Sequence, residues 1–351
     1  MPTRNDDTMK KFLAIIFGIL FAFLIAEVIL RLISPILFDQ FTVFDTVSFD
    51  PELGHKFREI DVLIKNGDNV NYKLTTIGIK GVNIRDSKFN GQIFAVAVGD
   101  SFTLSDGVNL TDAWTEVLER RLNKSIVNMG VYSYNTISNY KMLEMYGMKF
   151  SPDIVFFGFS RGDTLESEEF SKSSRLVKDF LNEYSYFYRF VKLIKHIAEN
   201  TYAAEPLFYS GNTTVTLIPD FHFKGKYNSI EFQNGISLVR QNILAAKTLA
   251  EIKGAKFILI LFPGKEQVYS PEISELTDAG NLDFFYESDS IKKFCIENNM
   301  ECIDLLTTFT ENKQNQLFYN VDGHPNKEGN KLIADSIYKY LKDKNFINQD
   351  D

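Results

Sequence analysis

One apolar stretch constrains the fold of this chain more than any other. Residues 94–98 form an unbroken run of apolar, mostly small or β-branched residues, which is typical of a strand buried on both faces of a parallel sheet. The run ends abruptly at Gly99-Asp100-Ser101, and an amphipathic helix is expected over residues 112–123. A strand, a tight turn and a helix would place Ser101 at the carboxyl edge of the sheet, where open α/β sheets bind ligands. Because these three residue types are also common in ordinary turns, the stretch alone leaves an ordinary turn and a nucleophile both open.

Strands and helices alternate along the rest of the chain, which predicts a parallel sheet covered by helices. The expected strands are residues 93–98, 125–128, 153–159, 256–262 and 301–305. The expected helices are residues 112–123, 135–147, 174–199, 235–253, 287–298 and 326–342. Residues 37–92 are an extracytoplasmic lead-in with short strand-like pieces, expected to form either a short antiparallel excursion or an extended wrap onto the main domain. An aromatic-rich insertion at about 164–232 interrupts the alternation, includes a possible extra strand at 213–218, and is placed to cap the active edge.

The segment from Phe12 to Ile33 is apolar and is broken only by Glu27 and Arg31. As a helix it would be roughly 33 Å long, enough to cross a hydrocarbon core of about 30 Å. Glu27 and Arg31 stand four residues apart and are expected to pair on one face of that helix. A cleaved signal peptide is the alternative, but residues 33–37 offer no small-residue cleavage site. A buried helix of a soluble domain fits less well, because the segment is apolar on all sides.

Charged residues beside this segment predict its orientation. Lys10 and Lys11 precede it, whereas the charged residues between it and Lys56 are all acidic. The positive-inside rule then gives a cytoplasmic tail (1–11), a transmembrane anchor (12–36) and an extracytoplasmic domain.

Composition excludes several classes of partner. The net charge of −8 argues against nucleic acid. The only cysteines, Cys295 and Cys302, form no framework and have no metal-ligand spacing, so a local disulfide and two small core residues both stay open. No metal and no organic cofactor is indicated.

A second candidate for chemistry lies near the C-terminus. His324 precedes the helical pattern of residues 326–342, in a loop where its side chain can be displayed. Asp322, two residues earlier, can orient the imidazole and stabilise the imidazolium. With Ser101 these residues make up a nucleophile, a base and an orienting acid, although Asp-Gly-His-Pro by itself is also a turn. Three other histidines have no comparable neighbours and are expected to be structural or on the surface: His55, His196 and His222.

These two motifs, in this order, resemble the SGNH (GDSL) hydrolase family, in particular its membrane-anchored bacterial branch. The resemblance extends over about residues 12–342. Further stretches carry it: Ala26-Glu27-Val28-Ile29-Leu30-Arg31, Thr75-Thr76-Ile77-Gly78-Ile79-Lys80-Gly81, Val127-Asn128-Met129-Gly130-Val131, Ser151-Pro152-Asp153-Ile154-Val155 and Phe262-Pro263-Gly264-Lys265-Glu266-Gln267-Val268-Tyr269.

The resemblance implies a flavodoxin-like three-layer α/β/α sandwich with a five-stranded parallel sheet over residues 93–345. It also implies that Ser101 attacks an ester carbonyl, His324 acts as general base and then acid, and Asp322 orients His324. The backbone N–H of Ser101 would donate to the oxyanion. An acyl-enzyme would form and then pass its acyl group to water or to another alcohol.

The sequence departs from the family pattern at three places. Ser133 stands where the family usually has the glycine that supplies the second oxyanion donor, and its backbone N–H survives the change. Gly162 stands where an asparagine side chain usually supplies the third donor, with Arg161 or Ser160 as possible substitutes. Asp322 and His324 are two residues apart instead of the commoner three, a spacing shared with some enzymes that acetylate envelope polysaccharides.

Three functions follow as hypotheses. The first is an anchored extracytoplasmic esterase or O-acyltransferase that acts on an envelope glycan or a small ester. The second is a catalytically weakened SGNH-fold protein that binds or scaffolds envelope polysaccharide. The third is an acyltransferase that depends on a membrane-bound acyl-donor partner.

Overall fold

A five-stranded parallel sheet forms the centre of the protein. The structure, a computed structural model, describes residues 4–37, 46–66, 68, 70–86, 92–171, 174–202, 207–210, 213–216, 227–276 and 282–347. The sheet strands in chain order are β7 (Ile93–Val98), β8 (Ser125–Asn128), β9 (Ile154–Phe159), β12 (Lys256–Leu261) and β13 (Glu301–Asp304). Their order in space is β13-β12-β9-β7-β8, and every pairing is parallel. The predicted sheet and all five of its strands are confirmed, with ends within one residue of those expected.

Strand β7 lies where the strand order reverses. It pairs with β8 on one side, with Ala97 opposite Asn128, and with β9 on the other, with Ala97 opposite Phe156. Open α/β sheets bind their ligands at such a reversal, outside the carboxyl ends of the strands. Ser101 follows the end of β7 directly, so the topology places it at that position.

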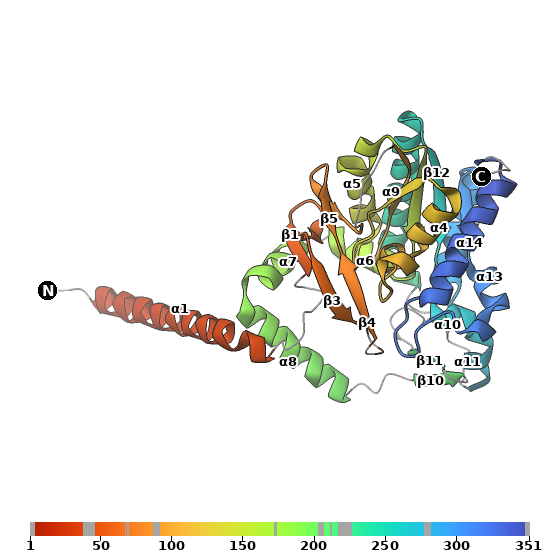
Figure 1. Ribbon diagram of the computed structural model, residues 1–351. Coiled ribbons are helices and arrows are strands. Elements are labelled where there is room, and N and C mark those ends of the chain that lie inside the picture. The colour runs from red at the N-terminus through yellow and green to blue at the C-terminus, as the bar shows by residue number, and fades with distance from the viewer. Residues whose placement is uncertain are drawn as a thin grey trace.

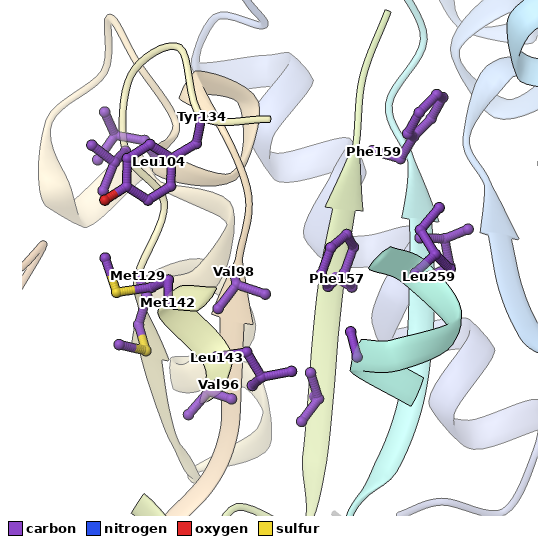
Figure 2. Packing of buried hydrophobic residues seen from close by; sticks show 14 of the residues in the cluster. Val96, Val98, Leu104, Met129, Tyr134, Met142, Leu143, Phe157, Phe159 and Leu259 are labelled. Carbon is purple, nitrogen blue, oxygen red and sulfur yellow. The ribbon is translucent and has the colours of Figure 1, made fainter. Parts of the chain in front are cut away.

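Helices cover both faces of the sheet, giving three layers (Figure 1). The covering helices are α4 (Trp114–Leu122), α5 (Thr136–Met145), α9 (Ile230–Ile252), α12 (Tyr286–Glu297) and α14 (Lys327–Asp343). Val96 and Val98 of β7 pack in one cluster with α5, as Figure 2 shows, while Ala95 and Ala97 pack in the other with Trp114 of α4. The alternation of side chains along a strand fixes this division.

Two helix predictions were wrong at their boundaries. The helix expected over 174–199 is two helices, α7 (Ser174–Tyr184) and α8 (Tyr186–Tyr202), because the Ser185 hydroxyl accepts from the Tyr188 N–H and starts a new helix. The helix expected from 235 begins five residues earlier, after the cap residue Ser229. Gly235 is a point of close packing within α9, since a Cβ there would lie 2.1 Å from the Thr164 carbonyl oxygen.

Several short elements were not predicted. They are β1 (Val47–Asp50), β2 (Gly54–Phe57), β6 (Val82–Ile84), β10 (Leu207–Ser210), α3 (Ser101–Leu104), α6 (Asp163–Ser171), α10 (Lys265–Val268), α11 (Ser270–Leu276) and α13 (Leu306–Glu311). The extra strand is present as β11 (Thr213–Thr216), paired with β10, while residues 217–226, which include the last two of the predicted strand, lie outside the described residues.

The lead-in forms three antiparallel hairpins: β1 with β2, β3 (Asp61–Lys65) with β4 (Asn71–Thr75), and β5 (Ile77–Ile79) with β6. Of the two alternatives for this region, the described residues show the antiparallel one. Leu53, Phe57, Leu74 and Ile84 are buried in the same cluster as Val96, so the described part of the lead-in packs onto the main domain. Residues 38–45, 67, 69 and 87–91 lie outside the described part.

Helix α1 (Arg4–Leu37) contains a stretch from Met9 to Ile33 that is long and apolar enough to cross a membrane. It extends away from the sheet and meets α8 near its C-terminal end (Figure 1). The predicted pair forms, with Arg31 bonded to Glu27 at 3.0 Å. The helix already begins at Arg4, so it includes most of the residues of the predicted cytoplasmic tail, and residues 1–3 lie outside the described chain.

Candidate active site

The structure brings Ser101, His324 and Asp322 into one chain of hydrogen bonds. His324 Nε2 lies 2.7 Å from Ser101 Oγ, and His324 Nδ1 lies 2.6 Å from Asp322 Oδ1. The side chains of His324 and Asp322 are 24% and 15% exposed. A hydroxyl, an imidazole and a carboxylate in this order can move a proton from the hydroxyl to the ring and hold the resulting imidazolium.

The turn that carries Ser101 is held by its neighbours. The Asp100 carboxylate accepts from the Phe102 N–H at 2.9 Å and caps α3, in which Ser101 is the first residue. The turn lies very close to β9: a Cβ on Gly99 would lie 1.9 Å from Thr103 Oγ1, and one on Gly158 would lie 2.2 Å from it. Glycine is therefore required on both strands for Thr103 to fit between them.

A buried arginine supports the far end of this turn. Arg85, 1% exposed, donates to the Leu104 carbonyl, to the Ser105 carbonyl at 2.6 Å, and to the Val108 carbonyl. Because α3 is a single turn, these carbonyls have few partners within the helix itself. The lead-in thus stabilises the loop that follows the nucleophile.

The loop that carries His324 closes on itself. Phe318 and Pro325 form an antiparallel bridge, and the Tyr319 N–H donates to the His324 carbonyl at 3.1 Å. Asp322 Oδ1 accepts from the backbone N–H of His324 at 2.9 Å and also bonds its ring at 2.6 Å. The carboxylate therefore fixes both the turn and the imidazole. In this way an Asp only two residues before the His can still orient the ring.

Sequence reasoning missed two residues that hold this loop. Asp68 accepts from the Val321 and Asp322 N–H groups, at 2.9 and 2.7 Å. Lys265 donates to the Tyr319 and Asn320 carbonyls, at 2.6 and 2.7 Å. Burial lowers the pKa of Lys265 to about 8. Lys265 stands in a stretch that carries the family resemblance, but its role did not follow from that stretch, because both residues are distant in sequence from the loop that they hold.

A second carboxylate, that of Asp106, was also missed. Its Oδ2 lies 3.9 Å from His324 Nδ1, and its backbone N–H donates to the Ser101 carbonyl at 2.9 Å. The Tyr72 hydroxyl donates to the same carboxylate. Burial alone would lower the pKa of His324, but the hydrogen bond to Asp322 and the nearby Asp106 carboxylate raise it to about 9. The only signal in the sequence is the position of Asp106 five residues after Ser101.

Ser133 adopts the left-handed conformation, with φ of 52°, that a glycine would favour. It lies in a turn in which the Tyr134 N–H donates to the Val131 carbonyl at 3.3 Å. That turn is attached to the nucleophile strand, because the Val131 N–H donates to the Gly99 carbonyl at 3.1 Å. The backbone of Ser133 thus has the conformation of the glycine that the family resemblance leads us to expect there.

The residues expected to supply a third oxyanion donor bond to internal carboxylates. The Gly162 N–H is directed at Glu287 Oε2 at 3.5 Å, and Gly162 has a φ of 102°. Arg161 pairs with Glu266 at 2.9 Å. Ser160 Oγ donates to Asp100 Oδ2 at 2.5 Å.

Behind these residues the protein buries several acids. Asp163 is 1% exposed and accepts from the Ser160 N–H at 2.8 Å. Burial, followed by the neighbouring Asp100 carboxylate, raises the pKa of Asp163 well above its ordinary range. The carboxyl end of β9 is thus built around hydrogen bonds that run inward.

Within the described residues no group of three or more His, Cys, Asp and Glu side chains could hold a metal ion. Cys295 and Cys302 are free thiols, so the structure has the two core residues and no disulfide. His55 bonds the Tyr132 carbonyl at 2.7 Å, which fits the expected structural role. The side chain of His196 and the whole of His222 lie outside what the structure describes.

No family model matches the chain, and no curated protein matches it. The solved structures similar to it are GDSL hydrolases and esterases. A protein described as lipolytic and of the G-D-S-L family, from Desulfitobacterium hafniense, is 18% identical, covers 71% of this chain and 100% of its own, and has a TM-score of 0.41. An acetylxylan esterase from Geobacillus stearothermophilus is 12% identical over 73% of this chain and 96% of its own, with a TM-score of 0.41. A GDSL-like lipase from Bacteroides thetaiotaomicron is 14% identical over 71% and 88%, with a TM-score of 0.38.

Proposed function

We propose that this chain is a membrane-anchored serine esterase or O-acyltransferase of the SGNH type. One observation carries the proposal: Ser101 Oγ, both ring nitrogens of His324 and the Asp322 carboxylate form a continuous hydrogen-bond chain, with distances of 2.7 and 2.6 Å. Its position at the strand-order reversal, at the carboxyl edge of the sheet, is where a substrate can reach it.

The reaction we assign is covalent acyl transfer. His324 Nε2 takes the proton from Ser101 Oγ while the oxygen attacks the ester carbonyl, and Asp322 stabilises the imidazolium. The tetrahedral intermediate collapses, the C–O bond to the alcohol breaks, and His324 returns the proton to the leaving alkoxide. Water or a second alcohol then attacks the acyl-serine with His324 again as base, which releases the acid or the new ester.

The oxyanion we assign to two backbone donors, the N–H groups of Ser101 and Ser133. Among the described residues no hydrogen bond engages either N–H, and the left-handed backbone of Ser133 supports its role. Gly162 and Arg161 are left out of this role because they bond to Glu287 and Glu266. Losing one oxyanion donor typically lowers turnover by about 10²–10³, so we expect a slower enzyme than one with three donors.

The membrane is part of the proposal. We place the predicted anchor, residues 12–36, across the bilayer, with the N-terminus in the cytoplasm and the catalytic domain outside, on the basis of the length of the apolar stretch and of Lys10 and Lys11, which precede the anchor. The expected substrate is an ester or acylated carbohydrate of the cell envelope. A membrane-bound acyl donor is the expected partner if transfer replaces hydrolysis, and no nucleic acid is expected.

A second function is favoured by the β9 side of the site. There Ser160, Arg161 and Gly162 bond to internal acids, which fits a protein of this fold that binds envelope polysaccharide without efficient turnover.

Hydrolysis separates these functions. The full chain in detergent micelles is assayed on p-nitrophenyl acetate, on other short acyl esters and on acetylated sugars, with Ser101→Ala alongside. The proposal predicts turnover that Ser101→Ala abolishes. Equal, background-level turnover by both proteins on every ester, together with retained binding of polysaccharide, would favour the second function.

A further inference from the structure

A carboxylate inside the apolar stretch of α1 bonds to the start of another helix. Glu27 accepts from the backbone N–H groups of Tyr186 and Phe187, each at 2.9 Å, and from the Ser185 hydroxyl at 3.1 Å. A charged side chain within a membrane span is costly unless it is paired. Here Glu27 caps α8 from outside that helix, which also favours a negative charge at its N-terminus.

Two further contacts join the same elements. Arg31 donates to the Tyr184 carbonyl at 2.7 Å and lies over the Tyr186 ring at 5.1 Å. The Phe187 ring meets the Phe23 ring edge-on, with centroids 5.1 Å apart. Glu27 and Arg31 lie roughly 9 Å and 3 Å of helix before Ile33, the end of the apolar stretch, so the junction lies near the C-terminal end of that stretch.

The segment α7–α8, residues 174–202, exposes apolar side chains beside this junction. They recur at helical spacing and are about half exposed: Val177 (59%), Phe180 (49%), Tyr184 (51%), Val191 (47%) and Ile194 (52%). Exposed lysines stand among them: Lys178, Lys192 and Lys195. Apolar side chains with lysines beside them suit a helix in a bilayer interface, where the long stems reach the headgroups.

The same segment is fixed to the catalytic domain. Glu183 pairs with Arg58 at 3.1 Å and accepts from the Phe49 N–H, and Phe180 packs edge-on against Phe49 with centroids 5.9 Å apart. The α7–α8 segment therefore connects the anchor to the hairpins of the lead-in through specific contacts.

We propose that the α7–α8 segment lies in the outer lipid–water interface as a second membrane contact and holds the catalytic domain at a fixed orientation to the bilayer. The occupant of its apolar face is lipid, because the face continues directly from a helix that would itself be surrounded by lipid. This inference rests on the anchor in the proposed function and not on its chemistry.

The test uses the full chain in liposomes made with either ordinary or bromine-labelled phospholipid, which quenches tryptophan on contact. The wild-type chain gives the baseline from buried Trp114. Val191→Trp and Val177→Trp report on the segment, and Phe17→Trp reports on the span. Ile252→Trp, at the end of α9 and 75% exposed, is the matched control on the catalytic domain.

We expect Val191→Trp and Val177→Trp to lose fluorescence in brominated lipid to an extent near that of Phe17→Trp, while Ile252→Trp loses none. One outcome would overturn the inference and leave the anchor intact: Phe17→Trp is quenched, but Val177→Trp and Val191→Trp are quenched no more than Ile252→Trp. Shielding of these two positions from aqueous acrylamide without quenching by lipid would show that a protein covers the face, and would also overturn it. An unquenched Phe17→Trp would remove the anchor and the inference together. Ester hydrolysis is measured on the same samples, so failure of the chemistry is scored separately.

Discussion

Two neighbouring regions at the same edge of the sheet are built in opposite ways. On the His324 side, the hydrogen bonds form a chain that ends at Ser101 Oγ, because Asp322 bonds His324 and His324 bonds Ser101. On the β9 side the polar contacts run inward, because Arg161 forms an ion pair with Glu266 and the Gly162 N–H points at Glu287. The difference teaches that the Ser101, Asp322 and His324 side chains can form a continuous hydrogen-bond chain at this edge while the neighbouring residues of the β9 side contact internal carboxylates.

The largest effect should come from removing the nucleophile. Ser101→Ala should lower kcat on p-nitrophenyl acetate by on the order of 10⁴–10⁶, since it removes the oxygen on which the proposed acyl-enzyme forms. Ser237→Ala, an exposed serine on α9, is the matched control and should leave kcat unchanged. Equal activity of Ser101→Ala and the wild type would remove Ser101 from the mechanism.

The next largest effect separates the two carboxylates near His324. Asp322→Asn should lower kcat by about 10³–10⁴, because the carboxylate 2.6 Å from Nδ1 orients the ring and stabilises its charge. Asp106→Asn should cost much less, since its carboxylate lies 3.9 Å from Nδ1. If the order of these two losses is reversed, Asp106 is the orienting acid.

The pH profile tests the electrostatics on the base side. Because the pKa of His324 is raised to about 9, the free enzyme carries an imidazolium at neutral pH, and kcat/KM should rise about tenfold per pH unit until it levels off near pH 9. Asp322→Asn should move this limb to lower pH. A rise of kcat/KM that levels off at pH 6 or below would contradict a His324 whose pKa is raised by Asp322 and Asp106.

The raised pKa of His324 also makes the stability of the fold depend on pH. Its stabilising contribution is complete below about pH 6.5, the ordinary pKa of a histidine, and is lost as the pH rises through about 9. The thermal midpoint, measured over this pH range, checks this contribution.

The smallest effect on turnover is expected on the β9 side. Arg161→Ala should change kcat less than tenfold but should destabilise the fold by about 3–5 kcal/mol, because it leaves the buried Glu266 carboxylate without its partner. Glu266→Gln in the same chain should restore much of the thermal midpoint. A loss of 10²–10³ in kcat at unchanged stability would instead make Arg161 an oxyanion donor.

Most of the sheet could be predicted from the sequence because its strands are buried on both faces and therefore read as continuous apolar runs. Local capping decided what was missed. Ser185 and Ser229 set helix boundaries that hydrophobic periodicity does not show. The predicted helix began at Gly235, but this glycine lies inside a longer helix, where it permits close contact with Thr164.

The candidate site, like the fold, could be predicted from the sequence only in part. Ser101, Asp322 and His324 stand in short local motifs, so the sequence could identify them. Asp106 could not be recognised, because its approach to His324 depends on how two loops meet. Asp68 and Lys265 were missed for the same reason, since each reaches the His324 loop from a distant element.

Labelling of the full chain with a fluorophosphonate tests the central claim, that His324 activates Ser101, most directly. The probe phosphonylates an activated serine whatever the natural substrate is, and mass spectrometry of the digested protein locates the adduct. We predict an adduct on Ser101 that forms faster as pH rises towards 9 and does not form in His324→Ala. An unlabelled Ser101, or a Ser101 labelled equally fast without His324, would contradict the account.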